Sequence, residues 1–218
     1  ILPGGTGNVF ATELGIPRRI RFAASLIAGP HKLRTVDVGW AGSEPFLVAA
    51  ATGVVANSMR DADQQMKEQL GYLAYVVIGF RELANPLPAT YALTLDGQQA
   101  SGEGMACVVS NTSNYGISGD TAFPWSDISD GMLDVVLLPT NSVQTFLALM
   151  ATTAGFQELA GVLRRWQAQH VILHADPPQQ ITCDGDMVGE TPVEITIRHK
   201  ALKVIVPERA TVIRPGVV

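Results

Sequence analysis

The longest regular pattern of apolar and polar positions runs over residues 61–83. Apolar side chains recur there at intervals of four, three, four and three residues, which places them on one face of an α-helix. They are Met66, Leu70, Leu73, Val77 and Phe80. The pattern predicts a helix over Asp61–Leu83 whose apolar face either packs in a core or lines an apolar site. The periodicity alone favours the core.

Apart from this helix, most apolar residues alternate with polar ones or form short runs, as they do in β-strands. Residues 89–95 and 104–111 flank Asp96-Gly97, a strong signal for a hairpin turn. Other strands are predicted over residues 31–39, 44–51, 132–138, 171–174, 181–183, 193–198 and 202–206, and helices over residues 9–14, 18–28 and 142–166. Many short strands between frequent turns predict a mainly β protein with helices (α+β), built as an antiparallel β-sandwich-like domain.

A glycine-rich loop, Pro-Gly-Gly-Thr-Gly-Asn, occupies residues 3–8. Its glycines allow a ligand to approach the backbone, and Thr6 and Asn8 are good N-cap residues for the helix that follows. A helix that begins at such a loop presents free N–H groups and the positive end of its dipole, which suit a phosphate. An ordinary capped loop explains the same residues at least as well.

Composition narrows the class of protein. The chain has 15 basic and 20 acidic residues, a net charge of −5, whereas a nucleic-acid-binding protein normally has a basic excess. Local basic clusters at residues 18–21 and 198–200 could meet anionic lipid headgroups, although such clusters are more often a solvated surface. Cys107 and Cys183 lie far apart in apolar segments, and no apolar run reaches bilayer length. We therefore expect buried thiols in a cytoplasmic protein with at most peripheral membrane contact.

Two groups of carboxylates could carry chemistry. Asp127 and Asp130 precede a strand and can bind a hard cation through oxygen ligands, but turn formation before a glycine explains the same spacing. Asp184 and Asp186 stand between two strands, where an ionised carboxylate can accept the proton of an attacking hydroxyl. An ordinary Asp-Gly hairpin turn is the favoured explanation from these residues alone.

Three segments resemble the diacylglycerol kinase-like lipid kinases, a family that includes the sphingosine and ceramide kinases. Residues 2–17 are similar to its P-x-GT-x-N…LGIP segment, residues 124–138 to its P-x-A-x-x-DDG-x-LDV segment, and residues 181–207 to its DGE…P-x-A-L-x-V-x-V-P terminus. The resemblance implies that residues 1–30 are the tail of an N-terminal nucleotide-binding domain and that residues 31–218 form a β-rich substrate domain. Since the chain begins in mid-motif and lacks the family's GGDGT phosphate loop, we expect a fragment of a longer protein.

The resemblance also implies roles for individual residues. It makes Asp184 the catalytic base and makes Asp127, Asp130 and the carbonyl of Met132 the ligands of a structural Mg²⁺. The residues it places beside ATP are Gly5, Thr6, Asn8 and Asp186. The residues it places beside the lipid are Asn57, Leu73 and Val77, the last two on the helix predicted over residues 61–83. The sequence departs from the family's pattern at Val9, Thr12, Val55 (in a turn predicted over residues 53–56) and Asp186.

We therefore predict part of an ATP- and Mg²⁺-dependent kinase that phosphorylates the hydroxyl of a diacylglycerol-like lipid, and we expect the chain to be inactive alone. An NAD kinase-like enzyme shares the two-domain plan and is one alternative. A non-catalytic lipid-binding or regulatory module, suggested by the four departures, is another. The sequence names neither the lipid nor the oligomeric state, and a homodimer is compatible with it.

Overall fold

The structure, a computed structural model, describes residues 1–5, 7–61, 88–113, 126–140 and 163–208. Thr6, Leu73 and Val77 lie outside the described residues, as do most of the helices predicted over residues 61–83 and 142–166. The helices are α1 (Val9–Glu13), α2 (Ile20–Ala28) and α3 (Val54–Asp61). The strands are β1 (Lys32–Ala41), β2 (Glu44–Phe46), β3 (Ala49–Thr52), β4 (Ala89–Leu95), β5 (Gln98–Ser110), β6 (Leu133–Pro139), β7 (Arg164–Ala168), β8 (His170–Asp176), β9 (Gln180–Cys183), β10 (Asp186–Glu190) and β11 (Val193–Val206).

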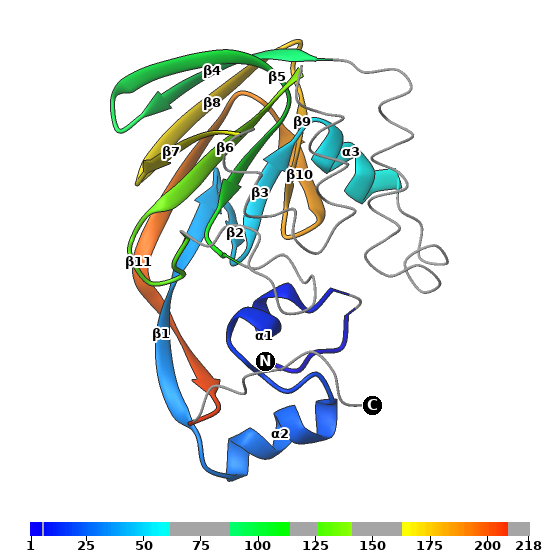
Figure 1. Cartoon of the computed structure of the whole chain (residues 1–218), viewed down its shortest axis with the longest axis vertical. Coiled ribbons are helices and arrows are strands. Elements are labelled where there is room, and N and C mark those ends of the chain that lie inside the picture. The colour runs from blue at the N-terminus through cyan, green and yellow to red at the C-terminus, as the bar shows by residue number, and fades with distance from the viewer. Residues whose placement is uncertain (6, 62–87, 114–125, 141–162, 209–218) are drawn as a thin grey trace.

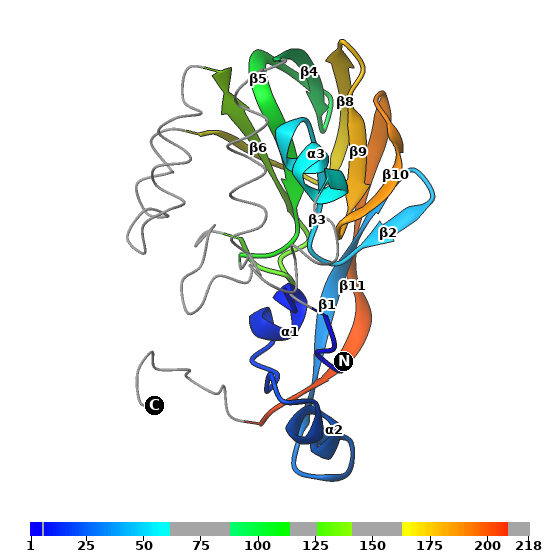
Figure 2. The ribbon, with the colours of Figure 1, turned by 90° about the vertical axis from the view of Figure 1, so that its right-hand side faces the viewer.

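Within the described residues these strands form one antiparallel sheet in the order β10-β9-β3-β5-β4-β8-β11-β1-β2, with β6 paired to β5 and β7 paired to β6. The sheet curves through the upper part of the molecule, and α1 and α2 lie below it beside the long strands β1 and β11 (Figures 1 and 2). The predicted mainly β, antiparallel architecture is confirmed.

The core has a large and a small part. The large part consists of buried side chains from nearly every strand of the curved sheet, including Tyr91, Leu93, Leu137, Leu173 and Ile195. The small part joins α1, the segment after it and α2 to β1 and β11 through Phe10, Leu14, Ile16, Ala23, Val36, Val204 and Val206. Each large apolar side chain so buried contributes about 1.5–3 kcal/mol. Residues 1–30 therefore share a hydrophobic core with the β-rich part.

Four local predictions were wrong. Residues 44–51 form two strands, because the N–H groups of Leu47 and Val48 bond to a side chain instead of a neighbouring strand. Residues 193–206 form one strand, which continues through Lys200 in a left-handed conformation (φ 50°). Residues 164–166, predicted to end a helix, belong instead to the strand β7, which pairs with β6. Residues 53–56 are not a turn, since α3 begins directly after Gly53.

Both cysteines are buried free thiols, as predicted, and burial raises the pKa of Cys107 and of Cys183 to about 12. Among the helices of the described residues, none has the length and apolar character that crossing a lipid bilayer requires.

Candidate functional site

Asp184 lies in the turn between β9 and β10, at the end of the sheet that faces α1 and the opening loop (Figures 1 and 2). Both Asp184 and Gly185 have positive φ, 51° and 103°. The carboxylate accepts hydrogen bonds from three consecutive backbone N–H groups: Leu47 to Oδ2 (2.8 Å), and Val48 and Ala49 to Oδ1 (2.8 and 3.1 Å). The carboxylate of the predicted base therefore holds the connection between β2 and β3.

The same connection is held from its other side by Asn111, at the end of β5. Its backbone N–H donates to the Val48 carbonyl (2.9 Å), and its side-chain amide donates to the Leu47 carbonyl (3.0 Å). Two residues further along, the Ser113 hydroxyl donates to the Glu13 carboxylate of α1 at 2.9 and 3.1 Å. Polar contacts at Asn111 and Ser113, which are two residues apart in the chain, thus link the connection held by Asp184 to the helix that follows the glycine-rich loop.

The opening loop is closed by its own asparagine. Asn8 Oδ1 accepts the Gly5 N–H (3.0 Å), and Asn8 Nδ2 donates to the Gly5 carbonyl (2.5 Å). Asn8 is left-handed (φ 46°), and its side chain makes no capping bond to α1. Asn8 is the N-cap residue of α1, as predicted, but its side chain bonds backwards into the loop instead of capping the helix. Asn8 and Gly5, both predicted beside the nucleotide, therefore contact each other.

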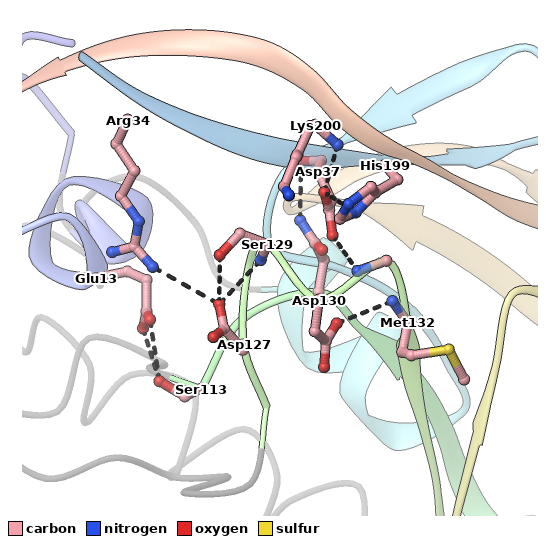
Figure 3. A network of polar contacts seen from close by, with 12 residues as sticks. Glu13, Arg34, Asp37, Ser113, Asp127, Ser129, Asp130, Met132, His199 and Lys200 are labelled. Carbon is pink, nitrogen blue, oxygen red and sulfur yellow. Dashed lines mark hydrogen bonds and ion pairs between the residues drawn. The ribbon is translucent and has the colours of Figure 1, made fainter.

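The aspartate-rich loop between residues 126 and 132 lies before β6 (Figure 3). Asp127 Oδ1 accepts from the Ser129 N–H (3.0 Å) and hydroxyl (2.7 Å) and lies 3.7 Å from Arg34. Asp130 Oδ1 accepts the Met132 N–H (2.9 Å). These are the turn contacts that the spacing of the aspartates allowed. Among the described residues, no hydrogen bond reaches Oδ2 of either aspartate.

Sequence reasoning missed the residue that holds this loop in place. Asp37 of β1 is fully buried, and its carboxylate accepts the Gly131 N–H (2.6 Å) and the Lys200 N–H (2.5 Å) and lies 3.1 Å from His199 Nδ1 (Figure 3). The ladder between β1 and β11 shifts register at Asp37, so β11 bulges there and leaves an N–H for the carboxylate. The one available signal was a charged residue inside a strand of β-branched residues, where Asp is rare.

The electrostatics of the loop fit a cation. Partial burial raises the pKa of Asp130 above its ordinary value; the Met132 N–H lowers it, and the charges of Asp127, Asp134 and Asp37 raise it further. The described residues contain no cluster of three or more His, Cys, Asp or Glu side chains that could hold a metal. Two carboxylates and the Met132 carbonyl are, however, hard oxygen donors of the kind that Mg²⁺ takes together with waters. The predicted ligands therefore fit a water-rich Mg²⁺ site, which stays a prediction.

Magnesium should stabilise the chain, and Asp130→Asn should remove that effect. Because its pKa is raised on folding, Asp130 favours the folded state only at low pH, and the benefit is lost as pH rises through its folded pKa. At neutral pH without divalent cations, Asp130→Asn should therefore give a slightly higher Tm. Added Mg²⁺ at 100 times its Kd should stabilise the wild type by about 2.7 kcal/mol and the variant much less. Thermal scans with and without MgCl₂ measure both effects; an equal response of the two proteins would exclude Asp130 as a ligand.

The predicted lipid-side residues are only partly described. Asn57 lies half-buried in the first turns of α3, where its N–H donates to the Gly53 carbonyl (2.9 Å). Asp186 is exposed at the start of β10. The basic cluster at residues 18–21 is exposed. Its residues Arg18, Arg19 and Arg21 alternate with the exposed apolar residues Ile20 and Phe22 at the start of α2. A surface groove of about 370 Å³ lies beside α2, lined by Ile1, Leu2, Ala23, Leu26, Ile27 and residues 202–205 of β11.

Known proteins share this sequence and fold. The family described as the YegS C-terminal NAD kinase β-sandwich-like domain matches residues 48–206, well over half of the chain. The diacylglycerol kinase of Bacillus subtilis is 28% identical over 212 residues, covering 95% of this chain and 69% of its own length. The "Probable lipid kinase YegS-like" of Pseudomonas fluorescens is 30% identical over 210 residues, covering 95% and 68%.

A crystal structure of a diacylglycerol kinase from Bacillus anthracis has the same fold, with a TM-score of 0.70 at 20% identity, covering 95% of this chain and 66% of that one. The chain spans between 49% and 69% of the length of the curated relatives that it matches. The resemblance seen in the sequence is confirmed at the level of the family. The chain belongs to the family of the YegS C-terminal, NAD kinase β-sandwich-like domain, which it shares with proteins named as diacylglycerol kinase and lipid kinase.

Proposed function

We propose that this chain is the substrate-side part of an ATP- and Mg²⁺-dependent kinase that phosphorylates the hydroxyl of a diacylglycerol-like lipid. The observation that carries the proposal is the family match over residues 48–206, together with relatives named as diacylglycerol and lipid kinases. In the reaction the lipid oxygen forms a bond to the γ-phosphorus, the bond from that phosphorus to the β-phosphate oxygen breaks, and ADP leaves. The hydroxyl proton passes to a carboxylate or to solvent.

The arrangement of the polar elements supports this proposal. The β9–β10 turn, the β2–β3 connection and α1 are linked through Asn111, Ser113 and Glu13. They link the turn that the resemblance places at the reaction to α1, the helix that follows the loop that it places beside the nucleotide. Catalysis of phosphoryl transfer is mostly positioning and electrostatic stabilisation, so a preformed set of backbone contacts is a suitable foundation.

Mg²⁺ would neutralise charge on the phosphates and, at the loop of Asp127 and Asp130, would hold that loop in place. Two residues of the chain itself would hold these loops in their orientation. Asp37 fixes Gly131 and so the aspartate loop, and Asn8 fixes the glycine-rich loop. A peripheral contact of the exposed basic and apolar residues at α2 with anionic lipid would bring the enzyme to its substrate.

Phosphorylation assays with two proteins test the proposal. The complete gene product should transfer radiolabel from [γ-³²P]ATP to diacylglycerol in mixed micelles, in a Mg²⁺-dependent reaction. The 218-residue chain alone should not, because it contains no GGDGT loop. Labelling of NAD in place of lipid would favour the NAD kinase-like alternative. Binding of lipid without labelling by the complete product would favour a non-catalytic module.

A further inference from the structure

The resemblance makes Asp184 the acceptor of the hydroxyl proton, but its contacts in this structure indicate a different role. We propose that Asp184 is a positioning residue whose carboxylate fixes the backbone of Leu47–Ala49 and, through it, the polar contacts that reach α1. The proposal rests on the proposed function for the reaction that this arrangement serves. It assigns the turn between β9 and β10 a structural task next to that reaction.

The hydrogen-bonding capacity of the carboxylate is largely used. Each carboxylate oxygen offers about two acceptor positions, and Asp184 accepts two N–H groups at Oδ1 and one at Oδ2. The Asp184 N–H also donates to the Ala49 carbonyl (3.0 Å), so backbone and side chain hold the same segment. These contacts place Asp184 to fix the segment Leu47–Ala49.

A second turn of the chain repeats the device. In the hairpin between β4 and β5, Asp96 and Gly97 also have positive φ, 48° and 86°, as the two central residues of a type I′ turn do. The Asp96 carboxylate accepts the N–H of Gln169 (3.1 Å to each oxygen) and of His170 (2.8 Å), between β7 and β8. A left-handed Asp before Gly therefore directs its carboxylate to a neighbouring connection in both hairpins. In the β4–β5 hairpin no reaction is assigned to it.

The segment that Asp184 holds is the central part of the candidate site. Its N–H groups face Asp184, while the carbonyls of Leu47 and Val48 accept from Asn111. Asn111 lies two residues before Ser113, which bonds to Glu13 of α1. Loss of the carboxylate would release one side of the β2–β3 connection and loosen the contact between the sheet and α1.

Amide hydrogen exchange on the 218-residue chain tests the positioning role without any activity. In Asp184→Asn, which keeps one acceptor oxygen and tolerates the left-handed conformation, and in Asp184→Ala, the amides of Leu47, Val48 and Ala49 should exchange at least about tenfold faster. The control Asp96→Asn should accelerate Gln169 and His170 and leave Leu47–Ala49 unchanged. Unchanged protection of Leu47–Ala49 in both Asp184 variants would overturn the proposal.

The pH profile of the complete gene product separates positioning from proton transfer. For a positioning residue, Asp184→Asn should lower kcat by about ten- to a hundredfold and leave the acidic limb of the profile at the same pH. Disappearance of that limb would show that Asp184 is the base and would overturn the proposal. If the complete product phosphorylates no lipid, the proposed function fails, and the exchange result alone decides whether Asp184 holds Leu47–Ala49.

Discussion

Replacing Gly53 with alanine is expected to lower the free energy of unfolding by about 3 kcal/mol or more. Gly53 lies between β3 and α3 with φ 67°, a conformation that costs an L-residue about 1–2 kcal/mol. An added Cβ would also overlap the Met105 carbonyl of β5 and lie 2.9 Å from the Tyr91 hydroxyl and 3.0 Å from the Ala106 Cα. Overpacking of this kind costs about 1–3 kcal/mol, and backbone atoms cannot rotate away to reduce it.

Gly42→Ala is the matched control, because Gly42 has nearly the same φ, 58°, and a Cβ added there would meet nothing within 4 Å. It should lose only the conformational cost of about 1–2 kcal/mol. Urea unfolding followed by circular dichroism gives both values, and their difference measures the close approach of β5. Equal losses would show that the sheet relaxes around Gly53. Since α3 starts directly after Gly53, the variant also tests how tightly the half-buried Asn57 is held.

Local signals in the sequence predicted the parts of the fold that depend on neighbours in the chain. The Asp96-Gly97 turn is one example, because a type I′ turn needs two residues that tolerate positive φ. The alternation around Leu93 and Leu173 is another, since a strand with one buried face repeats every second residue. The order of these strands in the sheet depends on pairing between segments that are far apart in the sequence. A pattern of neighbouring residues therefore does not predict this order.

The errors arose where a distant residue decides the local structure. Leu47 and Val48 have the composition of a strand, but the carboxylate that takes their N–H groups is 137 and 136 residues away in the sequence. Asp37 has the pattern of a polar residue on the exposed face of a strand, although the bulge of β11 buries it. Such contacts are set by tertiary packing and override local propensity.

For the candidate site, too, some features could be predicted from the sequence and others could not. Family resemblance named Asp184, Asn8 and the aspartate loop, and in the structure Asp184 bonds to the β2–β3 connection while Asn8 bonds to Gly5 in its own loop. The resemblance could not show which atoms those side chains contact. Spacing alone left open whether Asp184 is a base or part of an ordinary hairpin turn. The structure has Asp184 in a hairpin turn with its carboxylate bonded to Leu47–Ala49.

Replacing Asp37 with alanine is expected to cost about 2–4 kcal/mol, because a buried donor left without its acceptor costs about 1–3 kcal/mol. The buried Gly131 N–H and the part-buried Lys200 N–H would lose their acceptor, and His199, which is 47% exposed, would lose its carboxylate. Chemical denaturation at pH 7 measures this loss. Glu194→Ala is the control: Glu194 also contacts a histidine, His170, at 2.7 Å, but its side chain is 65% exposed. It should cost only about 0.2–1 kcal/mol.

The milder variant Asp37→Asn connects this stability to the metal prediction. Asparagine keeps one acceptor oxygen but turns an N–H₂ group towards a backbone donor, so either Gly131 or Lys200 loses its bond. If Gly131 is released, Asp130 and Met132 are no longer held in one arrangement, and the stabilisation by Mg²⁺ should shrink together with the stability of the metal-free chain. An unchanged Mg²⁺ response in a destabilised Asp37→Asn protein would mean that the loop keeps its shape without β1. The buried carboxylate would then serve only the bulge of β11.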